Sequence, residues 1–319
     1  MSQLLRPASV RGIVLYANRQ LDRFWAGLAD AADTGDAHSV HGLRVASRRL
    51  EACLNSWQAW VGRRCVRRAG RELKRVRQAF RGVRDLDVLL ASLSEPAMAP
   101  SLPPEDKARL AEVLEHRRSR LLARAAGLSR EPRLMRSLRV IREMTAEFEE
   151  TAGEEPDEVT RELCRRFRRD VEPFVNGSVC PDGESNLHEC RIACKRLRYR
   201  TQLFQEGACL DVAPVLDALT GMQRLLGRWH DHIVAGRTVG RLAIRRRFMA
   251  GETLRAALLL RYAAFRSEAA EDERHRVREQ WDSAVAALSA VIAAVDAMMA
   301  PEATGTAPGL PASGGSDHD

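Results

Sequence analysis

Two stretches of the sequence repeat one pattern of histidine and basic residues. The first, HGLRVASRRL, begins at His41, and the second, HECRIACKRL, begins at His188. In each stretch a basic residue follows the histidine at the third, seventh and eighth positions. On a helix, the histidine and the residues three and seven positions later lie on one face, because successive residues turn by about 100°. Such a row of cations with an imidazole at its end can bind successive phosphate or carboxylate groups of a polyanion.

The helix face opposite these cations is apolar in both stretches. It carries Leu43, Leu50 and Trp57 in the first stretch, and Leu197 and Phe204 in the second. This pattern predicts that the apolar stripe packs into a core while the basic face stays accessible. A solvated helix usually relieves its like charges with acidic residues four positions away, and these are nearly absent here. We therefore interpret both basic faces as binding surfaces rather than ordinary solvated surface.

A second pair of similar segments follows the basic stretches at a matched distance. LKRVRQAFRGVRDLDVLL follows the first, and LTGMQRLLGRWHDHIVAG follows the second. Arg84–Asp85 in one corresponds to His230–Asp231 in the other, and we expect each aspartate to hold a nearby Arg or His rather than to catalyse. The first segment continues with Leu-Asp where the second has His232 and Ile233, which predicts a rearrangement of the second segment.

The composition is that of a globular chain with a basic surplus. Of 319 residues, 45% are hydrophobic and 29% are charged, and the net charge is +8. Most of the basic residues are arginines, whose planar fork suits phosphate, and a basic balance indicates a polyanionic partner. Aromatic residues make up only 5% of the chain. Because stacking surfaces are scarce and no nucleic-acid-binding motif is present, we expect nucleic acid only as a non-specific competitor.

Apolar residues recur at intervals of three and four along nearly the whole chain, which predicts an all-α fold. The expected helices span 8–33, 39–61, 63–94, 105–127, 131–150, 157–176, 185–207, 211–245, 251–271 and 274–299. We interpret the matching motifs as an internal duplication, with repeats 8–150 and 157–299. The segment 151–157 is the expected linker, and 300–319 is the expected disordered tail.

The sequence also predicts a reduced, cytoplasmic protein. Its start lacks the long apolar core of a signal peptide, and its most apolar segment, 284–300, is too short and too polar for a membrane span. The seven cysteines form neither a CxxC pair nor the framework of a small secreted domain.

The repeated motifs resemble those of the CHAD family, the conserved-histidine α-helical domains. The resemblance covers residues 8–299 and rests on H-x-x-R-[VI]-x-x-[KR]-[KR]-L, present twice, and on the R-D-L-D-V and H-D segments downstream. It implies two helical bundles related by pseudo-two-fold symmetry, whose basic helices line a central groove or pore that binds inorganic polyphosphate. The residues that would line it are His41, Arg44, Arg48, Arg49, Lys74, Arg75, Arg81, Arg84, His188, Arg191, Lys195, Arg196, Arg198 and His230.

The resemblance implies a non-catalytic module that binds polyphosphate or targets polyphosphate granules, without a cofactor. Polyphosphate-metabolising enzymes on separate chains are further candidate partners, and no membrane is expected. Two alternatives stay open. An HD-type metal phosphohydrolase could use His188, His230 and Asp231, with His232 as a further candidate, although arginines around each histidine would repel a divalent cation. A scaffold could instead bind nucleic acid or an acidic protein through the same basic face.

Overall fold

The structure is a computed structural model that describes residues 9–94, 102–179, 181–182, 184–207, 211–244 and 253–299. Ten α-helices and one short 3-10 helix occur in these ranges, and no strand does. The predicted all-α fold is therefore confirmed. The expected tail, 300–319, lies outside the described residues.

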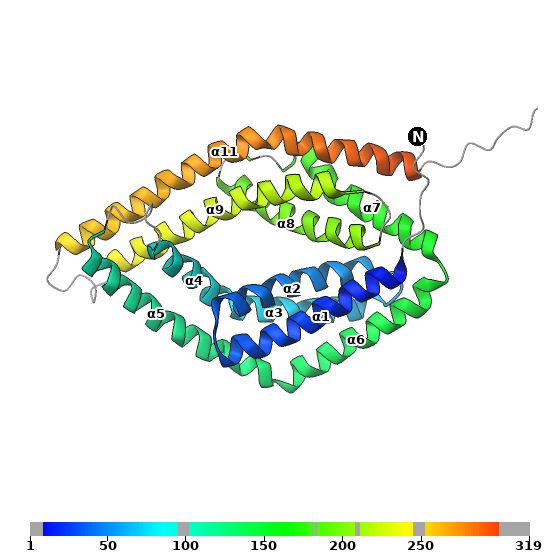
Figure 1. The fold of residues 1–319 in the computed structure, drawn as a ribbon, viewed down its shortest axis with the longest axis horizontal. Helices are drawn as coiled ribbons and strands as arrows, with labels where there is room; N and C mark the ends of the chain where they lie inside the picture. The colour runs from blue at the N-terminus through cyan, green and yellow to red at the C-terminus, as the bar shows by residue number, and fades with distance from the viewer. Residues whose placement is uncertain are drawn as a thin grey trace, which may run out of the picture.

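The helices form two groups that face each other across the molecule (Figure 1). The first half of the chain contributes α1 (Val10–Asp33), α2 (Ala37–Ser56), α3 (Arg63–Ala79), α4 (Arg81–Ser94), α5 (Pro104–Ala126), η2 (Gly127–Arg130) and α6 (Pro132–Gly153). The second half contributes α7 (Pro156–Val175), α8 (Glu184–Glu206), α9 (Ala213–Ala243) and α11 (Thr253–Met299).

Side-chain caps and prolines explain where several helices begin. The Ser9 hydroxyl accepts a hydrogen bond from the Gly12 amide at 3.0 Å and caps α1. The Asp36 carboxylate accepts one from the Ser39 amide at 2.9 Å and caps α2. These bonds satisfy amides that have no partner within the helix. Helices α5, α6 and α7 each start at a proline, whose fixed φ suits the first helical position.

The predicted single helix 63–94 is wrong, because it is two helices. Phe80 separates α3 from α4 with φ −87° and ψ 3°, and its side chain is fully buried. Beyond it α4 lies close to α5, and a Cβ atom at Gly82 would come within 2.9 Å of Leu121 Cδ1. Phe80 belongs to one core cluster and Leu86 to another, so the break lets one segment serve both cores.

Two other boundaries also differ from the prediction. The expected helices 251–271 and 274–299 are one helix, α11, of 47 residues. It contains no glycine or proline that would break it, and it is about 70 Å long. The expected linker 151–157 is mostly helical, since α6 reaches Gly153 and α7 begins at Pro156.

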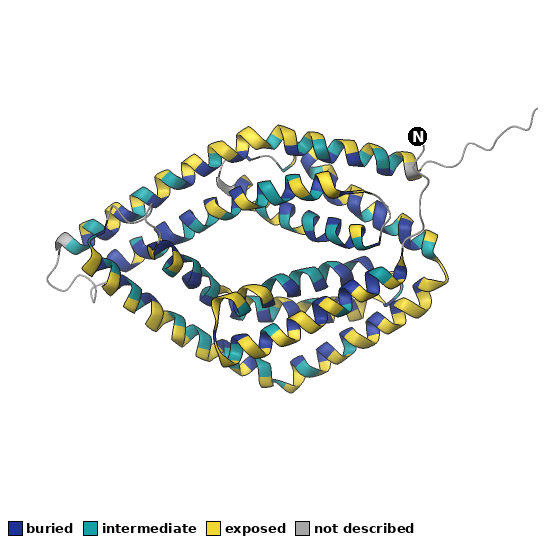
Figure 2. Ribbon diagram, in the orientation of Figure 1, coloured by how far each residue is buried: buried dark blue, intermediate teal, exposed yellow. Residues whose placement is uncertain are grey.

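Two hydrophobic clusters hold the helices together, and both cross between the halves of the chain. The larger cluster takes buried residues from all ten described α-helices, with only Val83 from α4 and Ala125 from α5. The smaller cluster joins α4 and α5 to the end of α9 and the beginning of α11. Outward-facing residues of α5, α6 and α11 are mostly exposed (Figure 2). The halves therefore share their cores and interlock, instead of packing as two separate bodies.

Within the described part of the chain, no helix is long and apolar enough to cross a membrane.

Candidate anion-binding site

The two basic stretches lie on helices α2 and α8, which pack against each other. Their apolar stripes are in the core as predicted, and Leu50 and Leu197 have no exposed surface. The stripes fix the rotation of both helices. The basic faces consequently meet at the boundary between the two halves of the chain.

Nine basic side chains from four helices interact electrostatically at this boundary. Lys195 interacts with Arg191, Arg48 and Arg44. His41 interacts with Arg84, Arg44 and Lys195, and His188 with His230, Arg191 and Arg81. We call this set the basic cluster: His41, Arg44 and Arg48 of α2, Arg81 and Arg84 of α4, His188, Arg191 and Lys195 of α8, and His230 of α9.

Burial, and after it the crowding of like charges, lowers the pKa values of several members of the cluster. Burial, followed by the charges of Arg191 and Arg48, lowers the pKa of Lys195 to about 7. Burial, followed by Arg48, lowers the pKa of Arg44 to about 10. Both causes disfavour the cationic form. An anion placed among these groups would favour it.

The histidines that lead the stretches respond in the same way. The pKa of His41 lies below its ordinary value, first because of burial and then because of Arg84 and Arg44. The pKa of His188 is also lowered, by burial and then by His230. The rings of His188 and His230 are stacked with their centroids 6.3 Å apart. In the free protein, His41 and His188 are therefore mostly neutral at pH 7.

Two aspartates interact with the basic cluster. Asp231 lies 3.6 Å from Nδ1 of His230, as expected for a carboxylate that holds its neighbour. Asp85 pairs with Arg81 at 3.7 Å rather than with Arg84. Both aspartates also offset the lowered pKa of Arg191. Two carboxylates do not balance the arginines and the lysine, so the cluster keeps an excess of positive charge.

Three residues predicted for the site lie outside the basic cluster. Arg75 pairs with Glu72 at 2.9 Å and Glu131 at 2.7 Å, which ties α3 to the start of α6. Arg196 lies 3.4 Å from Asp170 of α7. Arg49 lines a cavity between α1 and α2. Arg49 and Arg196 each directly follow a cation of the cluster in sequence. Neighbouring residues on a helix point in different directions, so these two side chains leave the cluster.

Two further predicted residues lie at or beyond the margin of the cluster. Lys74 is exposed on α3. Arg198 is half-buried, and its guanidinium carbon lies 5.4 Å from the ring centre of Tyr199. Tyr199, a neighbour of Arg191, is itself buried and lies on the wall between the halves.

Arg77 is a supporting residue that the sequence analysis did not identify. Its carbonyl oxygen accepts a hydrogen bond from Nη1 of Arg44 at 2.5 Å. Its own guanidinium pairs with Glu51 at 2.6 Å. A helical wheel of α3 places Arg77 nearer to the apolar stripe than Lys74 or Arg75, and this is the signal that could have identified it.

The described residues do not provide a metal site. Among them, no three histidine, cysteine or carboxylate side chains come together in a way that could hold a metal ion. His188, His230, Asp231 and His232, the candidates for an HD-type hydrolase, therefore form no such group among the described residues.

Comparison with known proteins identifies relatives of this fold. The sequence model of the CHAD domain family matches residues 15–240. The crystal structure of the CHAD domain from the plant Ricinus communis is similar with a TM-score of 0.64 at 20% identity, covering 91% of this chain and 94% of that chain. PptA from Streptomyces chartreusis is similar with a TM-score of 0.59 at 18% identity, covering 87% of this chain and 100% of that chain. No curated protein matches significantly.

Proposed function

Because the chain belongs to the CHAD family, and because helices α2, α4, α8 and α9 gather nine basic side chains, we propose that it binds inorganic polyphosphate at the basic cluster. The observation that carries this proposal is the packing of α2 against α8, which brings the cations of both halves together. Lys195 and His41 lie on different halves, yet each is influenced by cations of the other half. The positive charge of the two halves therefore forms one continuous cluster across their boundary.

A linear polyphosphate suits this arrangement physically. Its charge repeats along the chain, and it offers no base edges to read. From His41 to Arg48, or from His188 to Lys195, the helix rises by about 10 Å. Each row can therefore contact several successive phosphates through charge-assisted hydrogen bonds. Contacts to phosphate groups give affinity without any base sequence to read, which suits a polymer of identical units.

The proposed role is binding without catalysis. The protein would recruit itself, or an enzyme on a separate chain, to polyphosphate in the cytoplasm or on polyphosphate granules. Support for a passive role comes from the chemistry of the cluster, whose histidines lie among arginines that repel a divalent cation.

Calorimetric titration with polyphosphates of defined length, at two salt concentrations, tests the proposal. We expect affinity to increase with chain length, and log K to fall with log salt by about 0.7 for each phosphate neutralised, as for single strands. Heparin and DNA serve as competitors and should displace polyphosphate only at higher concentration. Equal affinity for orthophosphate and a long chain would contradict the proposal, because a single phosphate cannot occupy a row of cations.

A further inference from the structure

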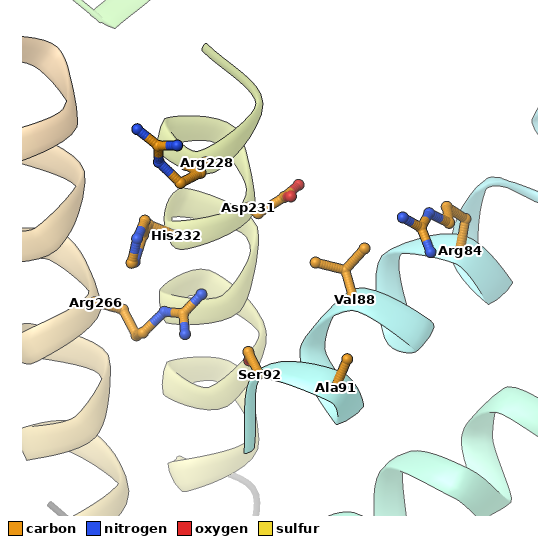
Figure 3. A pocket seen from close by; sticks show the side chains of 8 residues that line it. All are labelled: Arg84, Val88, Ala91, Ser92, Arg228, Asp231, His232 and Arg266. Atoms are coloured by element: carbon orange, nitrogen blue, oxygen red, sulfur yellow. The ribbon is translucent and has the colours of Figure 1, made fainter. Parts of the chain in front are cut away.

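A second basic cavity lies beside the cluster, between α4, α9 and α11. Its volume is about 250 Å³, and its polar lining consists of Arg84, Ser92, Arg228, Asp231, His232 and Arg266. Figure 3 shows Arg84 and Asp231 pointing toward each other from α4 and α9, and the Arg266 side chain extending from α11 toward α9. Arg84 also belongs to the basic cluster through its interaction with His41. The cavity and the cluster therefore adjoin.

Arg266 is the unusual residue of this cavity. It is 2% exposed, and no carboxylate of the described residues lies within ion-pair distance of it. Its guanidinium contacts the Tyr262 hydroxyl at 3.4 Å, and its Nε atom is buried without a hydrogen-bond partner. Another deeply buried arginine, Arg200, pairs with Asp170 at 3.0 Å. A buried cation without a counter-ion is costly, which indicates that an anion from outside completes the site.

The other charges around the cavity do not neutralise it. Glu273 of α11 pairs with Arg228 at 2.8 Å, but it is shared with Arg276 at 3.0 Å. Asp231 of α9 points toward α4 and is the other carboxylate of the cavity lining (Figure 3). His232 is buried, and its Nδ1 atom has no hydrogen-bond partner. Burial and then Arg266 lower the pKa of His232 to about 4, so the ring is neutral and can donate one hydrogen bond.

The size of the cavity limits what can occupy it. Ligand pockets for drug-sized molecules usually enclose about 300–1,000 Å³. A volume of 250 Å³ is smaller and suits a tetrahedral oxyanion with its nearest neighbour in a chain. A terminal phosphate carries up to two negative charges, with a second pKa near 6 as in a phosphate monoester, whereas an interior phosphate carries one. An excess of guanidinium groups favours the more highly charged end.

We propose that this cavity binds the terminal phosphate group of a polyphosphate whose interior lies on the basic cluster, an inference that rests on the proposed function. Arg266 and Arg84 would neutralise the terminal group, and His232 would donate a hydrogen bond to it. The same chemistry would accept free pyrophosphate, so the test must separate a chain end from a free ion.

The test uses three probes: pyrophosphate, long polyphosphate, and long polyphosphate whose two ends are capped by amines as phosphoramidates. The variant is Arg266→Gln, and the matched control is Arg261→Gln, which removes one charge from an exposed position of the same helix. For the wild type we expect one pyrophosphate per chain, bound at least tenfold more weakly by Arg266→Gln and unchanged in Arg261→Gln. Capping the ends should weaken long-chain binding by the wild type several-fold and leave Arg266→Gln unaffected.

The outcomes separate the two proposals. If the wild type binds no long polyphosphate, the proposed function fails. If it binds capped and uncapped chains equally, the proposed function stands and the chain-end assignment is overturned, even where pyrophosphate still binds at Arg266. Should Arg266→Gln not fold, His232→Asn gives the same comparison, because His232 lines the cavity and is not part of the basic cluster. Equal pyrophosphate affinity in wild type and that variant would also overturn the assignment.

Discussion

The two halves of the molecule each place an arginine next to the downstream motif, half-buried in the first half and fully buried in the second, and pair it in opposite ways. In the first half, Arg118 of α5 pairs with Asp87 of α4 at 2.5 Å, and also donates to the carbonyl oxygen of Gly35. In the second half, Arg266 of α11 faces His232 of α9 and has no carboxylate partner among the described residues. One half thus completes its ion pair internally, and the other leaves a cation available. The difference indicates that the first site stabilises the fold, and that the second can bind an external anion.

The helices around these arginines also differ between the halves, in whether they are interrupted. The first half breaks at Phe80 and again at η2, whereas α9 and α11 of the second half run without interruption. The breaks bring α4 and α5 against the far ends of α9 and α11, where the smaller core forms. Arg84 reaches both the basic cluster and the cavity because of this placement.

The largest expected effect tests the basic rows that both halves contribute to the cluster, one on α2 and one on α8. Changing Arg44, Arg48, Arg191 and Lys195 to alanine should reduce the binding free energy for polyphosphate by several kcal/mol, because each charge-assisted contact is worth about 1.5–3 kcal/mol. Isothermal titration of the two double variants, one for α2 and one for α8, should show similar losses. Stability should stay unchanged or increase slightly, since like charges are removed.

A matched control removes the same charge from the outer helices. Arg117, Arg120, Arg136 and Arg139 are exposed on α5 and α6. If alanines at these four positions weaken binding as much as the cluster variant does, the protein is a general polycation and the basic cluster is not its site.

The next effect tests the contrast between the two arginines. Arg118→Gln leaves Asp87 buried without its partner, and we expect a loss of about 3–5 kcal/mol in the free energy of unfolding, as for other broken buried ion pairs. Arg266→Gln strands no carboxylate, so its effect should be within about 1 kcal/mol and is expected to be stabilising. Urea unfolding in phosphate-free buffer measures both. Similar losses in the two variants would show that Arg266 is a structural residue like Arg118.

The sequence predicted the helix faces of the site well and the packing between helices poorly. Leu50 and Leu197 are buried as expected, because the apolar stripe of an amphipathic helix faces the core. Arg196 and Arg49 were assigned by adjacency to the other cations of the motif, and Arg75 as a basic residue of the third helix. Arg75 and Arg196 pair with carboxylates of other helices, and Arg49 lines a separate cavity. Such partners depend on tertiary contacts that a single helix does not encode.

The clearest missed signal lies in α11. Arg266 and Glu273 interrupt an apolar stripe that contains Tyr262 and Val277, so these charged residues had to be buried. The sequence analysis divided this helix near Asp272 and lost the stripe. Phe80 is different, because the nearby glycine, Gly82, lies inside α4 rather than at the break. The break serves the packing of two cores, which the sequence of one helix does not encode.

A smaller effect compares the same motif position in both halves, which is Arg48 in α2 and Lys195 in α8. The pKa of Lys195 is about 7, and a bound polyanion should raise it toward its usual range. Binding then takes up a proton, so affinity should fall as the pH rises from 7 to 9, by at most tenfold per pH unit. Lys195→Arg keeps the charge at every pH and should abolish this dependence. An unchanged pH profile in that variant would mean that Lys195 does not titrate on binding.

The smallest expected effect compares His41 with His188, and it appears below pH 7. Burial and neighbouring cations lower the pKa of both rings in the free protein. A polyanion stabilises the imidazolium and raises both pKa values, so binding should tighten as the pH falls from 7 to 5.5. The Lys195→Arg background removes the lysine from this range, and end-capped polyphosphate removes the titrating terminal phosphates. In that background His41→Gln and His188→Gln should each remove about half of the remaining slope, because both rings meet similar surroundings, and the double variant should bind with nearly constant affinity. If the double variant keeps the full slope, the two histidines do not protonate on binding and contribute to the cluster only as neutral hydrogen-bonding groups.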